Sequence, residues 1–374
     1  TLFKYISMKR IFSGITPSGQ PHIGNYFGMM KPLIDSQTPD NLVYFFISDQ
    51  HAFTSKRPRE DFIRNRDNAI LDWLALGADP EKSIFFLQSS VPAHTELAWY
   101  LSCSAGMGLL ERAHAFKDKT AKGLEANVGL FTYPILMAAD ILLYDLDFIP
   151  VGKDQKQHIE MARDIGEKFN AAYGPVFPLN FEAAIDENVM TIPGTDGAKM
   201  SKSYGNTLEI FADEKTLRKK VMSIQTGSEP LGASLNPDTC IVLQLHSILG
   251  NPDIQSLRDG YAAGTIGYGH AKQALFEYMW EYFRVAREKR AELEKDPGFI
   301  AQILKKGAEK AHSYADKKLH EVRKALRHIK FVTLSAAMRV FAMIPRLGKH
   351  SRHRASHIHF RREPVKFFGL HGFE

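Results

Sequence analysis

The sequence contains only two cysteines among its 374 residues. Cys103 and Cys240 lie far apart and belong to no metal-ligand pattern, so we expect neither a disulfide framework nor a cysteine-based metal site. This composition is typical of a reducing compartment and predicts a cytoplasmic protein. No apolar run approaches the roughly 18 residues that a membrane-spanning helix needs, which argues against membrane insertion.

An excess of basic residues is also missing from most of the chain. Of 48 Lys and Arg and 42 Asp and Glu, residues 330–374 hold nine and two. The remaining residues hold 39 and 40, a balance of −1. The net charge of +6 therefore gives no argument for RNA binding by the folded part of the chain.

The N-terminal part has neither a G-x-G-x-x-G dinucleotide fingerprint nor a Walker A loop. It nevertheless alternates strand-length apolar runs with helical patterns: strands at 9–15, 41–47, 84–88 and 147–151, helices at 22–35 and 59–77. This order predicts an α/β fold with a Rossmann-like, doubly wound parallel sheet. Such sheets bind ligands at the carboxyl ends of their strands, where Asp49, Gln50 and His51 follow the second strand.

A helix that we expect to start near Thr132, with Thr132 as its cap, carries one carboxylate on an apolar face. At about 100° per residue this face holds Tyr133, Met137, Asp140 and Tyr144. A buried carboxylate without a partner is costly, so Asp140 should have a hydrogen-bond donor. The donor is either internal, from a salt bridge or the backbone, or the N–H of an otherwise apolar ligand.

Two lysines three residues apart, Lys199 and Lys202, lie with serines in the Gly-preceded segment 197–203. Such a loop suits a triphosphate whose charge grows during a reaction, although a lone pair of this kind is usually a solvated turn. Its partner is the segment 21–25, where His22 and Asn25 share a face of a first helical turn. Gly24 between them allows a ligand to approach the backbone.

The chain divides into four predicted parts. Residues 1–7 are expected to be an N-terminal extension before Met8, and residues 8–203 form the Rossmann-like domain with an insertion at about 104–132. Helical patterns at 213–223, 238–249, 253–263, 268–295 and 298–329 predict a helical domain over 204–329. Residues 330–374 form a basic, His-rich tail outside the fold, for which we expect no genuine metal site.

Five ordered stretches carry a family resemblance: 12–26 (FSGITPSGQPHIGNY), 49–52 (DQHA), 137–144 (MAADILLY), 151–158 (VGKDQKQH) and 199–203 (KMSKS). The first and last are similar to the HIGH and KMSKS signatures of class I aminoacyl-tRNA synthetases. Together the five resemble the bacterial-type tryptophanyl-tRNA synthetases over about residues 8–329. Thr16 and Lys153 depart from the commonest pattern, which has glutamine and glutamate there.

The resemblance implies a role for each matching residue. It assigns tryptophan binding to Asp140, which would accept the indole N–H, and to Tyr133, Met137, Gln155, Phe12 and Val151. It assigns ATP binding to Thr16, Pro17, Ser18, Gly24, Asn25, Gly152, Lys153, Asp154, Val189, Lys199, Met200, Ser201, Lys202 and Ser203. It gives catalytic roles to Lys199, Lys202, His22, Asn25 and Lys117.

The implied reaction is the activation of L-tryptophan by ATP with Mg²⁺, followed by transfer to tRNA(Trp) through a helical tRNA- and anticodon-binding domain. No protein-ligated metal is expected, and the family implies a homodimer. Two alternatives are a tyrosyl-tRNA synthetase on the same fold and a small-molecule nucleotidyltransferase. A third is a non-catalytic, synthetase-like RNA-binding protein, which should have lost Lys199, Lys202 or His22, all present here.

Overall fold

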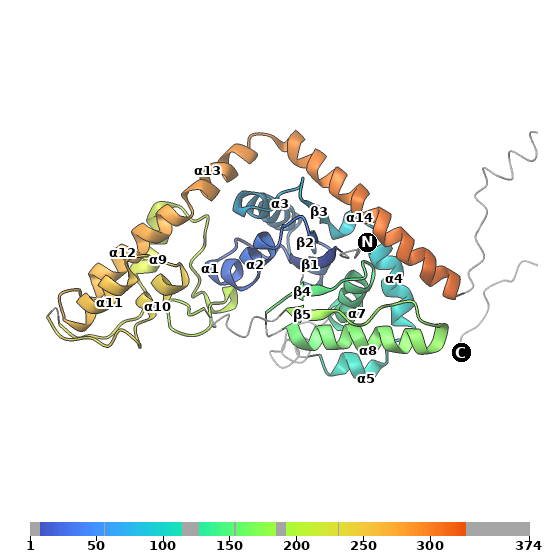
Figure 1. The fold of residues 1–374 in the computed structure, drawn as a ribbon, viewed down its shortest axis with the longest axis horizontal. Coiled ribbons are helices and arrows are strands. Elements are labelled where there is room, and N and C mark those ends of the chain that lie inside the picture. Colours follow the sequence, from blue (N-terminus) through green and yellow to red (C-terminus); the bar gives the residue numbers. More distant parts are fainter. Residues whose placement is uncertain are drawn as a thin grey trace, which may run out of the picture. The chain divides into compact units, whose positions relative to one another are not determined.

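A computed structural model describes residues 8–55, 57–113, 127–152, 155–184, 192–230 and 232–326. Its centre is one parallel sheet of five strands in the order β3-β2-β1-β4-β5 (Figure 1). The strands are β1 (Lys9–Ile15), β2 (Asn41–Ile47), β3 (Ser83–Leu87), β4 (Phe148–Pro150) and β5 (Glu182–Ala184). All neighbouring strands pair in parallel, which confirms the predicted sheet; β5 was not predicted.

Side chains of the central strands alternate between two buried layers, because successive residues of a strand point to opposite faces. On β2, Val43, Phe45 and Ile47 belong to one hydrophobic cluster. Tyr44 and Phe46 belong to the other. A sheet buried on both faces explains why its strands read as continuous apolar runs.

Helices cover both faces of the sheet. Before β4 they are α1 (Ile23–Asn25), η1 (Tyr26–Met30), α2 (Lys31–Asp35), η2 (His51–Thr54), α3 (Arg59–Leu76), η3 (Gln88–Ser90), α4 (Ala93–Ser102), α5 (Met107–Glu111) and α7 (Val128–Leu142); α8 (Lys156–Tyr173) follows β4. Trp73 of α3 packs in the cluster of Phe45. Residues of α4, α7 and α8 pack in the cluster of Phe46. The predicted helix at 22–35 is one helical stretch interrupted by the π-helical turn η1.

The prediction that Thr132 caps the carboxylate-bearing helix was wrong. The helix α7 begins four residues earlier, and Asn127 caps it by accepting a hydrogen bond from Leu130 N at 2.8 Å. Thr132 lies inside the helix, and its Oγ1 donates to Val128 O at 3.0 Å. Asn is as good a cap as Thr, so the sequence offered two possible starts.

Beyond residue 203 the described chain is helical: η5 (Lys202–Tyr204), α9 (Glu214–Met222), α10 (Ile241–Ile248), α11 (Ile254–Ala262), α12 (Tyr268–Tyr282), α13 (Arg284–Leu293) and α14 (Pro297–Ala325). The last helix returns to the sheet. A Cβ on Gly307 of α14 would lie 1.8 Å from Phe85 O, so this helix runs against β3 at a contact that only glycine permits. Ala311 and Ala315 of α14 are fully buried in the sheet's second cluster.

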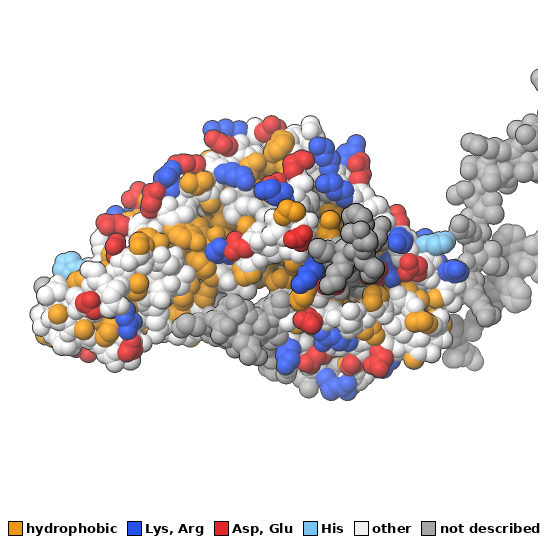
Figure 2. Space-filling model, in the orientation of Figure 1, with side chains coloured by type: hydrophobic (Ala, Val, Ile, Leu, Met, Phe, Trp, Pro, Cys, Tyr) orange, Lys and Arg blue, Asp and Glu red, His pale blue; other side chains and the backbone are white. Residues whose placement is uncertain are grey.

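The described residues 8–326 belong to one compact unit, and the predicted N-terminal extension and tail lie outside the described residues. The predicted boundary between a Rossmann-like and a helical domain near residue 203 lies inside this unit and remains a prediction. Among the described residues, no helix is long and apolar enough to cross a membrane. The charged side chains of α13 and α14 on the face shown in Figure 2 alternate in sign, and ion pairs such as Arg284–Glu288 account for part of this pattern.

Candidate active site

Asp140 is held by three protein donors at the edge of the sheet. It lies on α7, and its side chain is 2% exposed. His51 Nε2 lies 2.9 Å from Asp140 Oδ2, and His94 Nδ1 lies 2.6 Å from Asp140 Oδ1. Gln88 Nε2 donates to both oxygens, at 2.8 and 3.0 Å. The predicted donor is therefore present, and of the two alternatives left open the internal one is observed: side chains from the ends of β2 and β3 and the start of α4 supply it.

Gln88 has its amide orientation fixed by the backbone around it. Its Oε1 accepts hydrogen bonds from Gln50 N at 3.1 Å and His51 N at 3.3 Å. Since these two N–H groups require the oxygen on their side, the amide nitrogen must face Asp140. The side chain thus joins the carboxyl end of β2 to the carboxylate.

Two of these donors, His51 and His94, keep the carboxylate ionised although it lies inside the protein. Burial acts to raise the pKa of Asp140, but hydrogen bonds from His51 and His94 outweigh it and hold the pKa below its ordinary value. The site therefore presents a fixed negative charge beside aromatic and apolar side chains.

The apolar residues predicted for the ring pocket belong to, or pack against, the hydrophobic cluster that also holds Tyr144. Phe12 on β1 is buried and stacks on Tyr144 with ring centroids 5.6 Å apart. Met137 and Val151 are half-buried and pack against the same cluster. The ring centroids of Tyr133 and His51 lie 6.3 Å apart. The hydroxyl of Tyr133 bonds to His158 Nε2, and burial raises the pKa of Tyr133 to about 12. Gln155 directly precedes α8.

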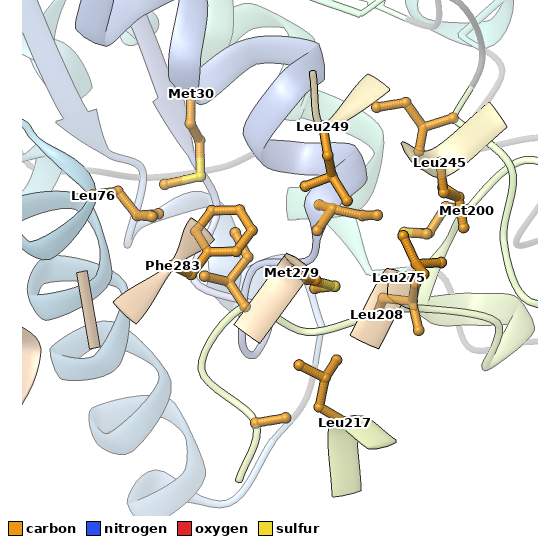
Figure 3. Close-up of a cluster of buried hydrophobic side chains, with 14 of the residues drawn as sticks. Met30, Leu76, Met200, Leu208, Leu217, Leu245, Leu249, Leu275, Met279 and Phe283 are labelled. Carbon is orange, nitrogen blue, oxygen red and sulfur yellow. The ribbon is translucent and has the colours of Figure 1, made fainter. Parts of the chain in front are cut away.

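The lysine loop and the first motif lie against each other, as predicted. Met200 is buried, and Figure 3 shows it among side chains of the helical part, near Leu245 and Leu275. A Cβ on Gly24 would lie 2.8 Å from His22 Nδ1 and 3.5 Å from Met200 Cβ. Lys202 Nζ donates to Gly19 O at 2.8 Å. Two segments about 180 residues apart in sequence thus form one surface.

The charges on this surface are shifted by burial. Burial lowers the pKa of Lys202 to about 8, with the charge of Asp72 acting in the opposite direction. Burial, with the charge of Lys202, lowers the pKa of His22 to about 4, so its imidazole is neutral at pH 7. Lys202 also lines an open cleft of about 690 Å³ together with Gln20, Thr207, Glu209 and Lys220.

Asn206 fixes the lysine loop, and sequence reasoning missed it. This buried amide donates to Asp196 Oδ1 at 2.7 Å and to Lys199 O at 3.1 Å. Its Oδ1 accepts from Ser201 N at 2.8 Å. Sequence reasoning also missed His94, because a single histidine in a helix carries no periodic signal. It missed Gln88 too, although the position of Gln88 at the carboxyl end of a predicted strand was a signal that could have found it.

Of the remaining predicted residues, one group lies in the described part of the chain and the other lies outside it. Thr16, Pro17, Ser18 and Asn25 lie in the loop and short helix after β1; Gly152 follows β4; Lys199, Ser201 and Ser203 belong to the lysine loop. Asn25 Oδ1 accepts from His22 N at 3.2 Å, and Thr16 Oγ1 lies 2.9 Å from Ser48 Oγ. Lys117, Lys153, Asp154 and Val189 lie outside the described residues. In the described part of the chain, no three His, Cys, Asp or Glu side chains are grouped to hold a metal ion.

Comparison with known proteins identifies the family of this chain. The family model described as tRNA synthetases class I (W and Y) matches residues 7–284. A tryptophan–tRNA ligase of Fusobacterium nucleatum is 51% identical over 317 residues, covering 84% of this chain and 97% of its own. One from Campylobacter jejuni is 47% identical over 314 residues, covering 84% and 98%.

Solved structures show the same relationship. The crystal structure of the Campylobacter jejuni tryptophanyl-tRNA synthetase, complexed with ADP and tryptophan, is 46% identical, with a TM-score of 0.80 over 85% of this chain and 99% of that chain. A tyrosyl-tRNA synthetase of Archaeoglobus fulgidus is 19% identical, with a TM-score of 0.57 over 75% and 90%, and shares the fold alone. The chain thus belongs to the class I tRNA synthetases for tryptophan and tyrosine, and within them to the tryptophanyl-tRNA synthetases.

Proposed function

We propose that this protein is a tryptophan–tRNA ligase that activates L-tryptophan with ATP and transfers the aminoacyl group to tRNA(Trp). The observation that carries the proposal is Asp140, a single ionised carboxylate beside the aromatic wall of Phe12 and Tyr144. An indole ring offers one N–H on an otherwise apolar surface, which this arrangement complements. The near full-length similarity to tryptophan–tRNA ligases supports it.

Tryptophan is proposed to bind with its indole N–H on Asp140. Phe12, Met137 and Val151 would line the ring, and Tyr133 and Gln155 would lie towards the α-amine. A phenol, which needs both a donor and an acceptor, would find the hydroxyl of Tyr144 already engaged with His94 Nε2 at 2.8 Å. The pocket therefore favours an indole over a phenol.

ATP, as its Mg²⁺ complex, is proposed to bind along the first motif and the lysine loop. Thr16, Pro17, Ser18, Gly24, Asn25, Gly152, Met200, Ser201 and Ser203 are the described residues of this site, and Lys117, Lys153, Asp154 and Val189 are predicted to complete it. Glycine is needed at position 24, because a side chain there would collide with His22. Lys199 and Lys202 are proposed to follow the phosphates.

In the first step, a carboxylate oxygen of tryptophan bonds to the α-phosphorus while the bond from that phosphorus to the pyrophosphate oxygen breaks. The products are tryptophanyl-adenylate and pyrophosphate. The leaving pyrophosphate gains negative charge, which the ammonium groups of Lys199 and Lys202 stabilise. His22 is neutral and can donate one N–H to a phosphate oxygen. In the second step, a terminal ribose hydroxyl of the tRNA displaces AMP.

The proposed partners are tRNA(Trp) and a second copy of this chain, in the cytoplasm. Of the six large hydrophobic residues that are more than 60% exposed in the described part of the chain, four support self-association: Phe53, Trp99, Met107 and Val128. They lie on α7 and on three elements that pack against it, η2, α4 and α5. Exposed apolar side chains gathered on neighbouring elements are typical of protein interfaces.

The test is amino-acid-dependent ATP–pyrophosphate exchange, with tryptophan and tyrosine in parallel. We expect exchange with tryptophan only, and a loss of at least about 10²-fold in kcat/KM in Asp140→Asn, where an amide replaces the charge. Asp316→Asn on the exposed side of α14 is the matched control and should retain full exchange. Exchange with tyrosine would identify the sister enzyme, and exchange with neither would favour a non-catalytic RNA-binding protein.

A further inference from the structure

We infer that His94, held by Tyr144, is a positioning residue that sets the preference of this pocket for a ring with an N–H group. The inference rests on the proposed role of Asp140. His94 belongs to none of the five motifs, and its function here is to orient the carboxylate and preserve its charge. Gln88 shares this role, whereas His51 is the donor that gives way to the ligand.

The imidazole of His94 bonds through both of its nitrogens. Nδ1 lies 2.6 Å from Asp140 Oδ1, and Nε2 lies 2.8 Å from the Tyr144 hydroxyl. Since a carboxylate can only accept, Nδ1 carries the proton. In the neutral imidazole Nε2 must then accept the hydroxyl proton of Tyr144. Burial raises the pKa of Tyr144 well above its ordinary value, so the hydroxyl keeps this proton. Tyr144 thereby fixes the tautomer that donates to Asp140.

Aromatic packing fixes the plane of the His94 ring. The ring stacks on Phe46 with centroids 5.6 Å apart and an interplanar angle of 25°, and lies 6.1 Å from Phe86. Its side chain is fully buried. The ring therefore cannot turn away without opening the second hydrophobic cluster.

Tyr144 is fixed in turn by charged side chains outside the pocket. Arg10 Nη1 donates to Tyr144 O at 2.9 Å. The next residue, Asp145, has a left-handed backbone with φ 48° and pairs with Lys318 of α14 at 2.8 Å. The chain from Lys318 to Asp140 thus connects the last helix to the ring pocket.

The four hydrogen bonds to Asp140 occupy both of its oxygens. An indole N–H can bind only where one donor withdraws. His94 and Gln88 are fully buried, whereas the side chain of His51 is 12% exposed and lies on η2 at the end of β2. His51 can therefore exchange its bond for one to water. The other two donors stay and keep the carboxylate aimed at the ligand.

The test compares binding of tryptophan with binding of β-(benzothiophen-3-yl)-L-alanine, in which sulfur replaces the indole N–H. Both dissociation constants are measured by calorimetry on the full chain and on variants. In His94→Leu, which lacks donors, we expect tryptophan to bind about 10- to 100-fold more weakly, the range for loss of a hydrogen bond to a charged group. The analogue should change less than about threefold, because it does not use the carboxylate.

Two further variants keep the test decisive if His94→Leu does not fold. His94→Asn places an amide N–H near the position of Nδ1 and should restore most of the discrimination. Tyr144→Phe removes only the hydroxyl and should weaken tryptophan binding about 3- to 10-fold while leaving the analogue unchanged. The matched control is His246→Gln, which replaces a buried histidine of α10 that bonds to Ala271 O and Asn251; it should alter neither ligand.

Equal weakening of both ligands would overturn the inference, since His94 would then only support the fold. Unchanged tryptophan binding in His94→Leu would overturn it as well. If the wild-type protein itself bound no tryptophan, the proposed function would fail instead, so the two failures are distinguishable. Selective loss of tryptophan binding, restored in His94→Asn, would establish His94 as the positioning residue.

Discussion

The ion pair between α3 and α13 allows a quantitative test of how this fold holds a charge in its interior. Asp72 is 1% exposed, and its Oδ1 accepts from Arg290 Nε at 2.6 Å. Arg290 Nη2 donates to Asn68 Oδ1 at 2.8 Å. Burial raises the pKa of Asp72 from 3.8 to about 6, although Arg290 acts to lower it. The carboxylate therefore depends on Arg290 to remain ionised above pH 6.

The sign of the pH dependence follows from this shift. A folded-state pKa above the unfolded value means that the contribution of Asp72 to stability is fully present below pH 3.8 and is lost as the pH rises through about 6. The shift corresponds to about 3 kcal/mol. Replacing Arg290 by Met leaves an unpaired buried charge, which costs about 3–5 kcal/mol at pH 8. At pH 5 Asp72 is mostly protonated in both proteins, and we expect a loss of about 1–2 kcal/mol.

The assay is urea unfolding of wild type and Arg290→Met at pH 5 and pH 8, followed by circular dichroism. Arg284→Met is the control, because Arg284 lies on the same helix, is 50% exposed and pairs with Glu281 and Glu288 at the surface. The control should lose at most about 1 kcal/mol at either pH. An Arg290→Met loss that is equal at both pH values, or no larger than that of the control, would refute the reasoning.

Two further predictions concern the lysine loop and the last helix. Because burial lowers the pKa of Lys202 to about 8, its ammonium loses its proton above pH 8, and kcat/KM for ATP in pyrophosphate exchange should fall there. In Lys202→Arg, whose guanidinium stays charged, the fall should move to higher pH. An unchanged pH profile in Lys202→Arg would contradict the assignment. Gly307→Ala places a methyl group 1.8 Å from Phe85 O and should lower the free energy of unfolding by about 1–3 kcal/mol or more. The control Gly269→Ala on α12 has no atom within 4 Å of the added methyl group and should not destabilise the protein. Equal unfolding midpoints for the two variants would show that α14 moves freely on β3.

The ring pocket illustrates how the sequence can predict a need without its solution. Periodicity placed Asp140 on an apolar helix face, and the cost of an unpaired buried carboxylate predicted a donor. The donors themselves come from Gln88 and His94, some 50 residues earlier, and from His51, about 90 residues earlier. Their convergence depends on the order of the strands, because β2 and β3 end beside α7 only in the folded sheet.

The sequence by itself determined the elements whose signal is local. Buried parallel strands appear as continuous apolar runs, and the helices beyond residue 203 appear as periodic patterns, so most were found close to their true bounds. The single helix predicted over 268–295 was wrong: the structure has two helices there, α12 and α13, separated at Phe283. The five motifs determined the family, because ligand contacts restrict residue type at fixed positions. A helix start that depends on one of two equivalent caps, Asn127 or Thr132, was not determined in this way.

Only the tertiary structure decided which side chains form hydrogen bonds with groups far away in the sequence. Lys202 on Gly19, Asn206 on the lysine loop, and the Tyr144–His94–Asp140 connection are contacts between segments that no period links. The packing of α14 on β3 is another contact of this kind. It depends on Gly307, which a sequence pattern would count only as a weak helix former. Burial creates these dependencies: a polar group removed from water must find its partner in space, and the fold determines which residue that partner is.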